Sequence, residues 1–358
     1  MGDAPLTRAS PRASWGSRVG LVSFRDVVAE GSASLQPLGF TERQARFLTT
    51  VMAHSGVFLE RQYCRFAGIA HGQKSHDFIE RLVQRGFARV EATSHLYQGR
   101  FYHLHHKRLY SLIGQTDNRN RKRAHRSRMI ERLMLLDIVL DDREMLWLGT
   151  ESDKARYFEE RLAQYRMTPR ELPHLAFGSG ERQVVRLFAD KLPIGVDPIG
   201  DRYVFTYLVT RSSPQEFRSF LIRHYSLMRP LVRWTLRVFV PRKFEKAIPA
   251  FRHAVNDEFR RPLRPCDGEE LMWFFRQRRD AARTPAFVPD ARYLDAARQF
   301  SAPRFSVLEK AWRLHGDDVI WNAYSKGIED QFDIGRAAVE FIVISRQYLH
   351  LAHLVGVA

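Results

Sequence analysis

Cysteine is scarce in this sequence, which holds only Cys64 and Cys266 among its 358 residues. Two thiols are too few for a disulfide framework or for a zinc site built from cysteine ligands. Long apolar runs are also missing, because no stretch approaches the 18 residues that a membrane-spanning helix needs. The first 34 residues lack the apolar core of a secretory signal peptide. These absences predict a protein of the reducing cytoplasm, without disulfides and without a membrane span.

Acidic residues are outnumbered by basic ones, with 40 Asp and Glu against 57 Lys and Arg and a formal net charge of +17. An excess of this size favours a polyanionic partner, because each neutralised phosphate releases condensed counterions. The charge alone does not choose among DNA, RNA and an acidic membrane surface. The hydrophobic fraction of 44% and the aromatic fraction of 12% are typical of globular protein with a packed core.

The pattern of apolar, basic and turn-forming residues divides the chain into five segments. We expect a disordered basic tail over 1–36, a compact patterned domain over 37–115, a basic helical connector over 116–143, a mixed α/β domain over 144–259 and a helical region over 260–358. Strands expected at 203–209 and 232–240 flank a helix at 214–225, which is the order found in mixed sheets. The expected fold class is therefore α+β.

The segment 37–115 carries the pattern of three short helices followed by a β-hairpin. Thr41 and Gln44 form a capping box at the start of the first helix. Gly86 follows the third helix and suits a left-handed C-terminal cap. The strand-like runs of the hairpin are 88–92 and 100–104. Three helices and a hairpin in this order predict a winged helix-turn-helix, whose third helix enters the major groove of double-stranded DNA.

Polar residues that the core of this domain does not need are the expected DNA contacts. Gln and His side chains hydrogen-bond base edges, whereas Lys and Arg neutralise phosphates. The candidates on the third helix are Gln73, Lys74, Ser75, His76, Arg81 and Gln84. The candidates on the wing and after it are His95, Gln98, Arg100, Lys107, Arg119, Arg121, Lys122 and Arg123. The alternative is that the winged helix docks a protein and that its charged face is simply solvated.

No cofactor or metal is expected. His103 and His105 fall on one face of the second hairpin strand, where two metal ligands are conceivable. No nearby Cys, Asp or Glu completes a site, and a wing that faces phosphates explains the histidines better.

A winged helix, a basic helical connector and a strand–helix–strand domain in this order resemble the replication-relaxation family of mobile-element and plasmid proteins. The resemblance covers about residues 37–254 and its first domain matches best. It implies that the second domain looks like a restriction-endonuclease-type core. Active nucleases with such a core use an Asp that ends one strand and a Glu-x-Lys on the next.

This chain departs from the nuclease pattern at both places. It reads Pro193-Ile194 where an active core would carry Pro-Asp, and its strand 204–209 contains no Glu-x-Lys. Asp197 and Asp201 are close by, but a turn with Pro and Gly between them reads as a hairpin connection. Because Mg²⁺ requires hard carboxylate oxygens, we expect a degenerate domain that has lost its metal site, and a protein that is not an enzyme.

The expected function is sequence-specific DNA binding in the cytoplasm, at the nucleoid, by a regulator or by a replication or mobilisation accessory factor of a mobile element. One alternative is a Mg²⁺-dependent nuclease guided by the winged helix, for which Glu181, Asp197 and Asp201 are the acids to test. A second alternative is a winged-helix protein-interaction scaffold. The amphipathic stripe of Phe305, Leu308, Ala311 and Trp312 caps the middle domain or forms a homodimer interface.

Overall fold

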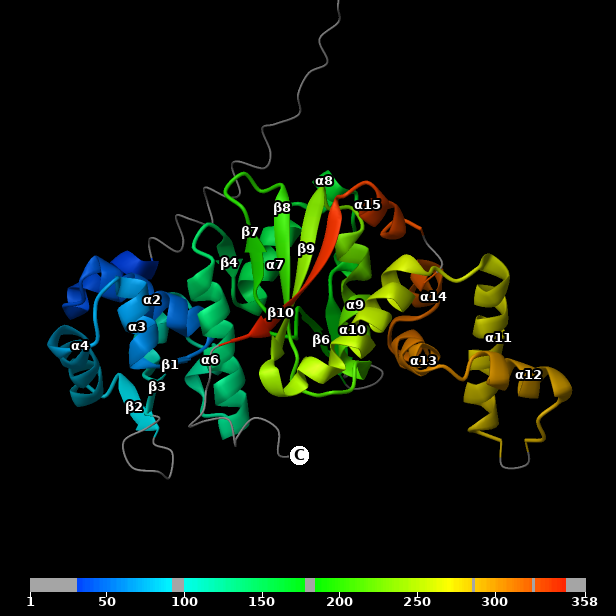
Figure 1. Cartoon of the computed structure of the whole chain (residues 1–358), viewed down its shortest axis with the longest axis horizontal. Helices are drawn as coiled ribbons and strands as arrows, with labels where there is room; N and C mark the ends of the chain where they lie inside the picture. The colour runs from blue at the N-terminus through cyan, green and yellow to red at the C-terminus, as the bar shows by residue number, and fades with distance from the viewer. Residues whose placement is uncertain (1–30, 92–99, 178–183, 285–286, 324–325, 346–358) are drawn as a thin grey trace, which may run out of the picture.

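The computed structural model describes residues 31–91, 100–177, 184–284, 287–323 and 326–345. The described chain combines helices with strands in three sheets, which confirms the predicted α+β class. In Figure 1 a unit built from the first helices and strands lies on the left, a five-stranded sheet with its helices lies in the centre, and further helices lie on the right.

The N-terminal unit contains the three helices and the hairpin that the sequence predicts. Its elements are η1 (Gln36–Leu38), α2 (Glu42–His54), β1 (Val57–Phe58), α3 (Glu60–Ala67), α4 (Gln73–Gln84), β2 (Ala88–Glu91) and β3 (Phe101–Leu104). The strands form an antiparallel sheet in the order β1–β3–β2. The capping box is confirmed, because the Thr41 hydroxyl accepts a hydrogen bond from the Gln44 backbone N–H at 3.3 Å and the Gln44 side-chain oxygen accepts one from the Thr41 backbone N–H at 3.1 Å. Gly86 follows α4 with a φ of +66°.

Aromatic side chains from all three helices meet in the core of this unit. The ring centroid of Phe47 on α2 lies 5.1 Å from that of Tyr63 on α3, which in turn lies 4.2 Å from that of Phe78 on α4. This packing fixes the angle between α3 and α4. The core also includes Leu35, which is fully buried. The tail expected over 1–36 is therefore wrong at its end, because Leu35 packs as part of the core; residues 1–30 lie outside the described residues.

The connector expected over 116–143 is a short helical turn, η2 (Arg119–Arg121), followed by the long buried helix α6 (Arg126–Asp141). The helix α5 (Lys107–Leu112) precedes it and packs into the core of the N-terminal unit through Leu109 and Tyr110. One side of α6 packs into the core of the N-terminal unit through Leu136 and Leu140. Other sides pack into a second core shared with β1 and the five-stranded sheet, for example through Leu133. Because α6 is enclosed by both cores, it joins the two parts of the molecule rigidly.

The five-stranded sheet has the order β10–β9–β8–β7–β4. The elements up to β9 are β4 (Leu146–Leu148), α7 (Glu151–Glu159), α8 (Leu162–Tyr165), η3 (Pro169–Glu171), β5 (His174–Phe177), β6 (Val184–Leu187), β7 (Ile194–Val196), β8 (Arg202–Leu208), α9 (Gln215–Met228) and β9 (Arg233–Pro241). Strands β4, β7 and β8 are antiparallel, whereas β8 and β9 run parallel across the crossover helix α9. The predicted strand–helix–strand order is thus confirmed. Strands β5 and β6 form a separate hairpin.

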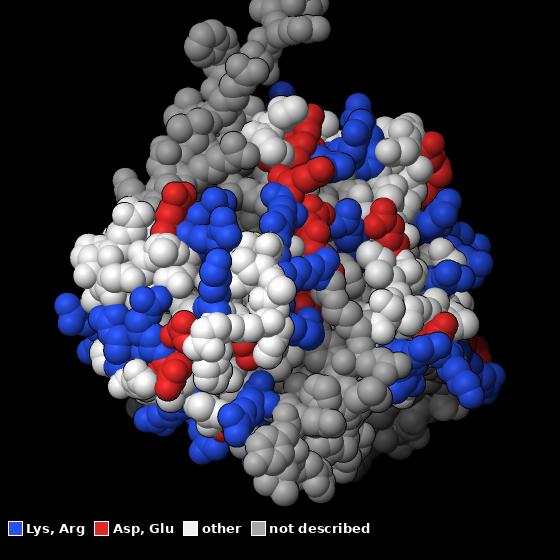
Figure 2. All heavy atoms as spheres, turned by 60° about the vertical axis from the view of Figure 1, so that its left-hand side comes forward, with Lys and Arg blue, Asp and Glu red and all other residues white. Residues whose placement is uncertain are grey.

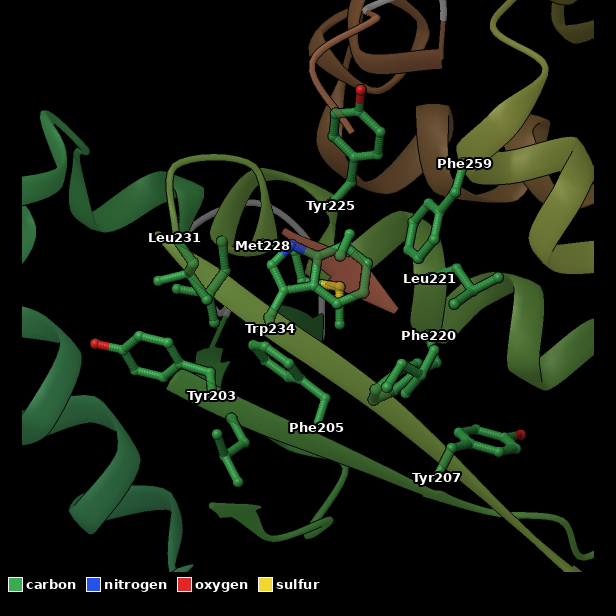
Figure 3. Close-up of a cluster of buried hydrophobic side chains, with 14 of the residues drawn as sticks. Tyr203, Phe205, Tyr207, Phe220, Leu221, Tyr225, Met228, Leu231, Trp234 and Phe259 are labelled. Carbon is green, nitrogen blue, oxygen red and sulfur yellow. The ribbon is translucent and has the colours of Figure 1, made fainter. Parts of the chain in front are cut away.

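Helix α9 covers one face of this sheet through a cluster of large side chains. Figure 3 shows Phe205 and Tyr207 on β8 beside Phe220 on α9, with Trp234 of β9 at the centre. The rings of Tyr207 and Phe220 lie 5.2 Å apart. The indole N–H of Trp234 is buried and donates a hydrogen bond of 2.6 Å to Gln331, so its burial leaves no polar atom unpaired.

The C-terminal part supplies helices and one strand. Its elements are η5 (Arg242–Ala247), α10 (Ile248–Val255), η6 (Asn256–Arg260), α11 (Pro265–Ala281), α12 (Ala291–Gln299), α13 (Pro303–His315), α14 (Asp318–Ala323), α15 (Glu329–Asp333) and β10 (Ala337–Ile344). The prediction of a helical region throughout 260–358 is wrong at β10, which pairs in parallel with β9. A short run of Val, Ile and Phe has no periodicity that distinguishes a strand from a helix. Here the run forms a strand because it pairs with the edge of β9.

The stripe on α13 is covered within the chain. Leu308 and Trp312 are buried in a fourth cluster that is built mainly from α11 to α14, and Phe305 and Ala311 pack against it. The stripe therefore faces neighbouring helices, so it offers no free apolar face for a second copy.

Candidate nucleic-acid interface

The helix α4 is exposed along one face and buried along the other. Glycine residues begin and end the five-residue turn between α3 and α4, and Gly68 adopts a left-handed conformation with a φ of +65°. The inward face of α4 consists of Ser75, Phe78, Ile79 and Leu82, which are all buried. The outward face consists of Gln73, Lys74, His76, Asp77, Glu80 and Gln84, which are all exposed. The polar side chains of α4 are thus available to a partner.

Two of the predicted contacts on α4 have other tasks. Ser75 is fully buried, and its hydroxyl lies 2.7 Å from a carboxylate oxygen of Glu60. It also accepts a hydrogen bond from the Gly72 amide, so it stabilises the start of α4 and cannot reach a base. Arg81 is half-buried and donates to Gln44 at 3.0 Å, which directs its guanidinium toward α2. The prediction of Ser75 as a DNA contact is therefore wrong, and Arg81 connects α4 to α2.

Acidic side chains stand at the centre of the outward face. On a helix with 3.6 residues per turn, Gln73, Asp77, Glu80 and Gln84 lie along one stripe. The amide of Gln73 donates to Asp77 at 2.5 Å and that of Gln84 donates to Glu80 at 3.0 Å. A phosphate would be repelled at this stripe, whereas a carboxylate would accept a hydrogen bond from the amino group of a cytosine. Contacts with phosphates must then come from residues beside this stripe, such as Lys74.

Figure 2 turns the N-terminal side of the molecule forward, and Lys and Arg side chains spread across this face with Asp and Glu among them. The hairpin contributes Arg100, which is exposed at the base of β3. Sequence reasoning missed Arg89, an exposed residue of β2. The signal was present, because alternation along a strand places Arg89 outward once its neighbour Ala88 is inward. The predicted contacts His95 and Gln98 lie outside the described residues.

The predicted basic residues after the wing lie in different environments. Lys107 and Lys122 are exposed. Arg123 forms an ion pair with Glu91 of β2 at 3.1 Å, which ties the connector to the hairpin. Arg121 donates to the Thr116 carbonyl at 3.3 Å. Arg119 instead lines a cleft against the five-stranded sheet, away from this group.

Hydrogen bonds fix the N-terminal unit to the connector. Arg61 on α3 makes two hydrogen bonds to the carboxylate of Asp137 on α6, at 2.9 and 2.7 Å. Gln62 is fully buried and donates to the Leu133 carbonyl of α6 at 2.9 Å. Asn120 is buried and binds the last turn of α2. The orientation of α3 and α4 is thereby set relative to the rest of the molecule.

The histidine of β3, His103, has a structural task. His103 is buried, and burial lowers the pKa of its ring below the usual range. Its Nε2 lies 3.0 Å from the Asn120 carbonyl, so a neutral ring donates this hydrogen bond. His103 therefore holds the connector and does not face phosphates. Among the described residues, no group of three or more His, Cys, Asp or Glu side chains is placed to hold a metal ion.

Asp197 stabilises the turn between the strands β7 and β8. One carboxylate oxygen of Asp197 accepts hydrogen bonds from the backbone amides of Gly200 at 2.6 Å and Asp201 at 3.0 Å. Although burial opposes ionisation, a hydrogen bond with the Asp201 side chain, followed by these backbone hydrogen bonds, holds the pKa of Asp197 below its usual range. The hairpin connection expected between Asp197 and Asp201 is confirmed. The strand β8 itself contains no acidic residue, and Glu181 lies outside the described residues.

None of the described helices is long and apolar enough to cross a membrane. Searches against protein-family models, curated proteins and solved structures returned no match.

Proposed function

We propose that this protein binds double-stranded DNA through a winged helix, formed by α2, α3, α4 and the sheet β1–β3–β2, and that it is not an enzyme. The observation that carries the proposal is the uncovered polar face of α4, which follows α3 after a glycine turn and lies next to a hairpin with exposed arginines. In helix-turn-helix proteins the second helix of the motif lies in the major groove. The net charge of +17 supports an anionic partner.

The proposed process is regulation of transcription, or replication or mobilisation of a mobile element, in the cytoplasm at the nucleoid. The order of the elements supports a relation to the replication-relaxation family. An antiparallel pair β7–β8, the crossover helix α9 and the parallel strand β9 follow the N-terminal unit and the connector. The absence of acids from β8 and the use of Asp197 in a turn support a domain that serves DNA grip or partner contact.

Selection of bound duplexes from a random library tests the proposal. A single enriched motif is expected, and a palindromic motif would indicate that two copies bind together. Binding that is indifferent to sequence would contradict the proposal. Lys74→Ala should weaken binding to all duplexes about equally and reduce the slope of log affinity against log salt by about 1. The matched control is Lys310→Ala, which removes an exposed lysine of α13 and should leave the slope unchanged.

A protein partner for α4 is the second candidate, because Asp77 and Glu80 occupy the centre of the outward face. Neutralising them by Asp77→Asn and Glu80→Gln separates the two proposals. If α4 lies against DNA, this double variant should bind random duplexes more tightly, because two charges that repel phosphates are gone. If α4 docks a protein, DNA affinity should not change.

A further inference from the structure

A cleft of about 870 Å³ lies between the connector and the five-stranded sheet, remote in the chain from α4. One wall is made by residues 114–120 and α6. The other is made by the start of α7, the segment before β7 and the helix α9. A cavity of this size accommodates a ligand of roughly nucleotide dimensions. The proposed DNA contacts on α4 do not line it.

Most charged groups that line the cleft are paired. Glu131 forms an ion pair with Arg128, and Glu151 forms one with Arg186. Asp190 lies 3.8 Å from the Lys154 ammonium and also faces His224. These three acids are therefore paired with groups other than Arg132 and Lys191.

Arg132 of α6 is a buried cation whose neighbouring acid, Glu131, is already paired with Arg128. It is 6% exposed, and it takes part in no ion pair within the described ranges. Its Nε and Nη1 atoms are buried without a hydrogen-bond partner among these residues. Burial, followed by the nearby Arg128, lowers the pKa of this guanidinium. A buried charge left unpaired is costly, so the folded protein gains when an anion occupies this place.

Lys191 adds a second cation from the opposite wall. It precedes β7, is half-buried and has a φ of +50°, which is uncommon for a residue with a side chain. It forms no ion pair with any residue that the structure describes. Burial and the charge of Arg132 lower the pKa of its ammonium to about 8. Both cations line the same cleft, so an anion bound there would relieve their mutual repulsion.

We propose that this cleft binds the phosphate group of a ligand between Arg132 and Lys191. Guanidinium groups bind phosphate through two parallel hydrogen bonds, and an ammonium adds a point charge. The cleft has room for a free phosphorylated molecule such as a nucleotide, which is the source that we favour. The phosphate of a DNA strand has the same chemistry, and the experiment distinguishes the two sources.

The probe for the free ligand is pyrophosphate, titrated at constant ionic strength and followed by calorimetry and by thermal unfolding. Saturable binding and a rise in Tm are expected for the unchanged protein and for the control Lys310→Ala. Lys191→Ala should lose roughly ten- to hundredfold in affinity, as expected for a hydrogen bond to a charged group. Arg132→Met replaces the unpaired charge with an apolar side chain of similar length. It should fold, unfold at a higher temperature than the unchanged protein without ligand, and fail to bind pyrophosphate.

Titration of the same variants with duplex DNA tests whether the cleft binds the phosphate of a DNA strand instead of a free ligand. If the cleft holds a DNA phosphate, pyrophosphate binds weakly, and Lys191→Ala reduces the salt slope of duplex affinity by about 1. If Lys191→Ala changes neither pyrophosphate affinity nor this slope, the proposal is overturned. A protein that binds pyrophosphate in the cleft but no duplex would support this inference and refute the proposed DNA binding.

Discussion

Asn120 holds the connector against the N-terminal unit, and its replacement by Ala has a calculable effect. Its side-chain amide donates to the carbonyls of Met52 at 3.1 Å and Ala53 at 3.2 Å. These carbonyls belong to the last turn of α2, where no intrahelical partner exists. Asn120→Ala removes both hydrogen bonds, each contributing about 0.5–1.5 kcal/mol, so the free energy of unfolding should fall by about 1–3 kcal/mol.

Urea unfolding followed by tryptophan fluorescence measures this loss. The midpoint should decrease while the m-value stays constant, because the surface exposed on unfolding does not change. The control is Asn256→Ala, which alters an exposed asparagine and should change stability by less than about 0.5 kcal/mol. An Asn120→Ala protein as stable as the control would refute the idea that this side chain fixes the connector to α2.

Three further predictions concern the contact between the units and the surface of α4. Gly149→Ala should destabilise the protein by roughly 1–3 kcal/mol in the same assay, because a Cβ atom there would lie 2.6 Å from the His54 ring and 3.0 Å from the Ala53 carbonyl. Burial lowers the pKa of His54 to about 3, so the unfolded chain binds a proton between pH 6.5 and 3 that the folded chain does not. The contribution of His54 to the free energy of unfolding should be complete above about pH 6.5. It should decrease as the pH falls through this window, by up to about 1.4 kcal/mol per pH unit. The urea midpoint of His54→Leu should therefore depend less on pH than that of the unchanged protein. Asp77→Asn with Glu80→Gln should raise affinity for random duplexes severalfold in fluorescence anisotropy titrations, and an unchanged affinity would mean that α4 does not approach phosphates.

The N-terminal unit could be predicted well because its signals are local. Thr41 and Gln44 start a helix by bonding to one another, and Gly86 supplies the left-handed residue after α4. The faces of α4 follow from helical periodicity alone. The burial of Ser75 could not be predicted, because it depends on Glu60, which is brought close by the turn between α3 and α4.

The parts that the sequence did not predict depend on contacts between distant segments. The run that forms β10 is equally compatible with a buried helix, and it becomes a strand because the edge of β9 lies open to it. Arg132 is a charged residue in a basic region of the sequence, and the packing of α6 between two cores buries it. Lys191 is 59 residues further along the chain, so no spacing rule connects the two.

Competition between a selected duplex and a random duplex tests the central claim most directly, with the unchanged protein compared with the variant Gln73→Ala/Gln84→Ala. Both side chains lie on the outward face of α4, and neither is needed by the core. If α4 reads bases, the double variant should keep its fold and its binding to random duplexes, and lose about tenfold or more of its preference for the selected duplex. An unaltered preference would show that α4 does not read DNA and would contradict the account.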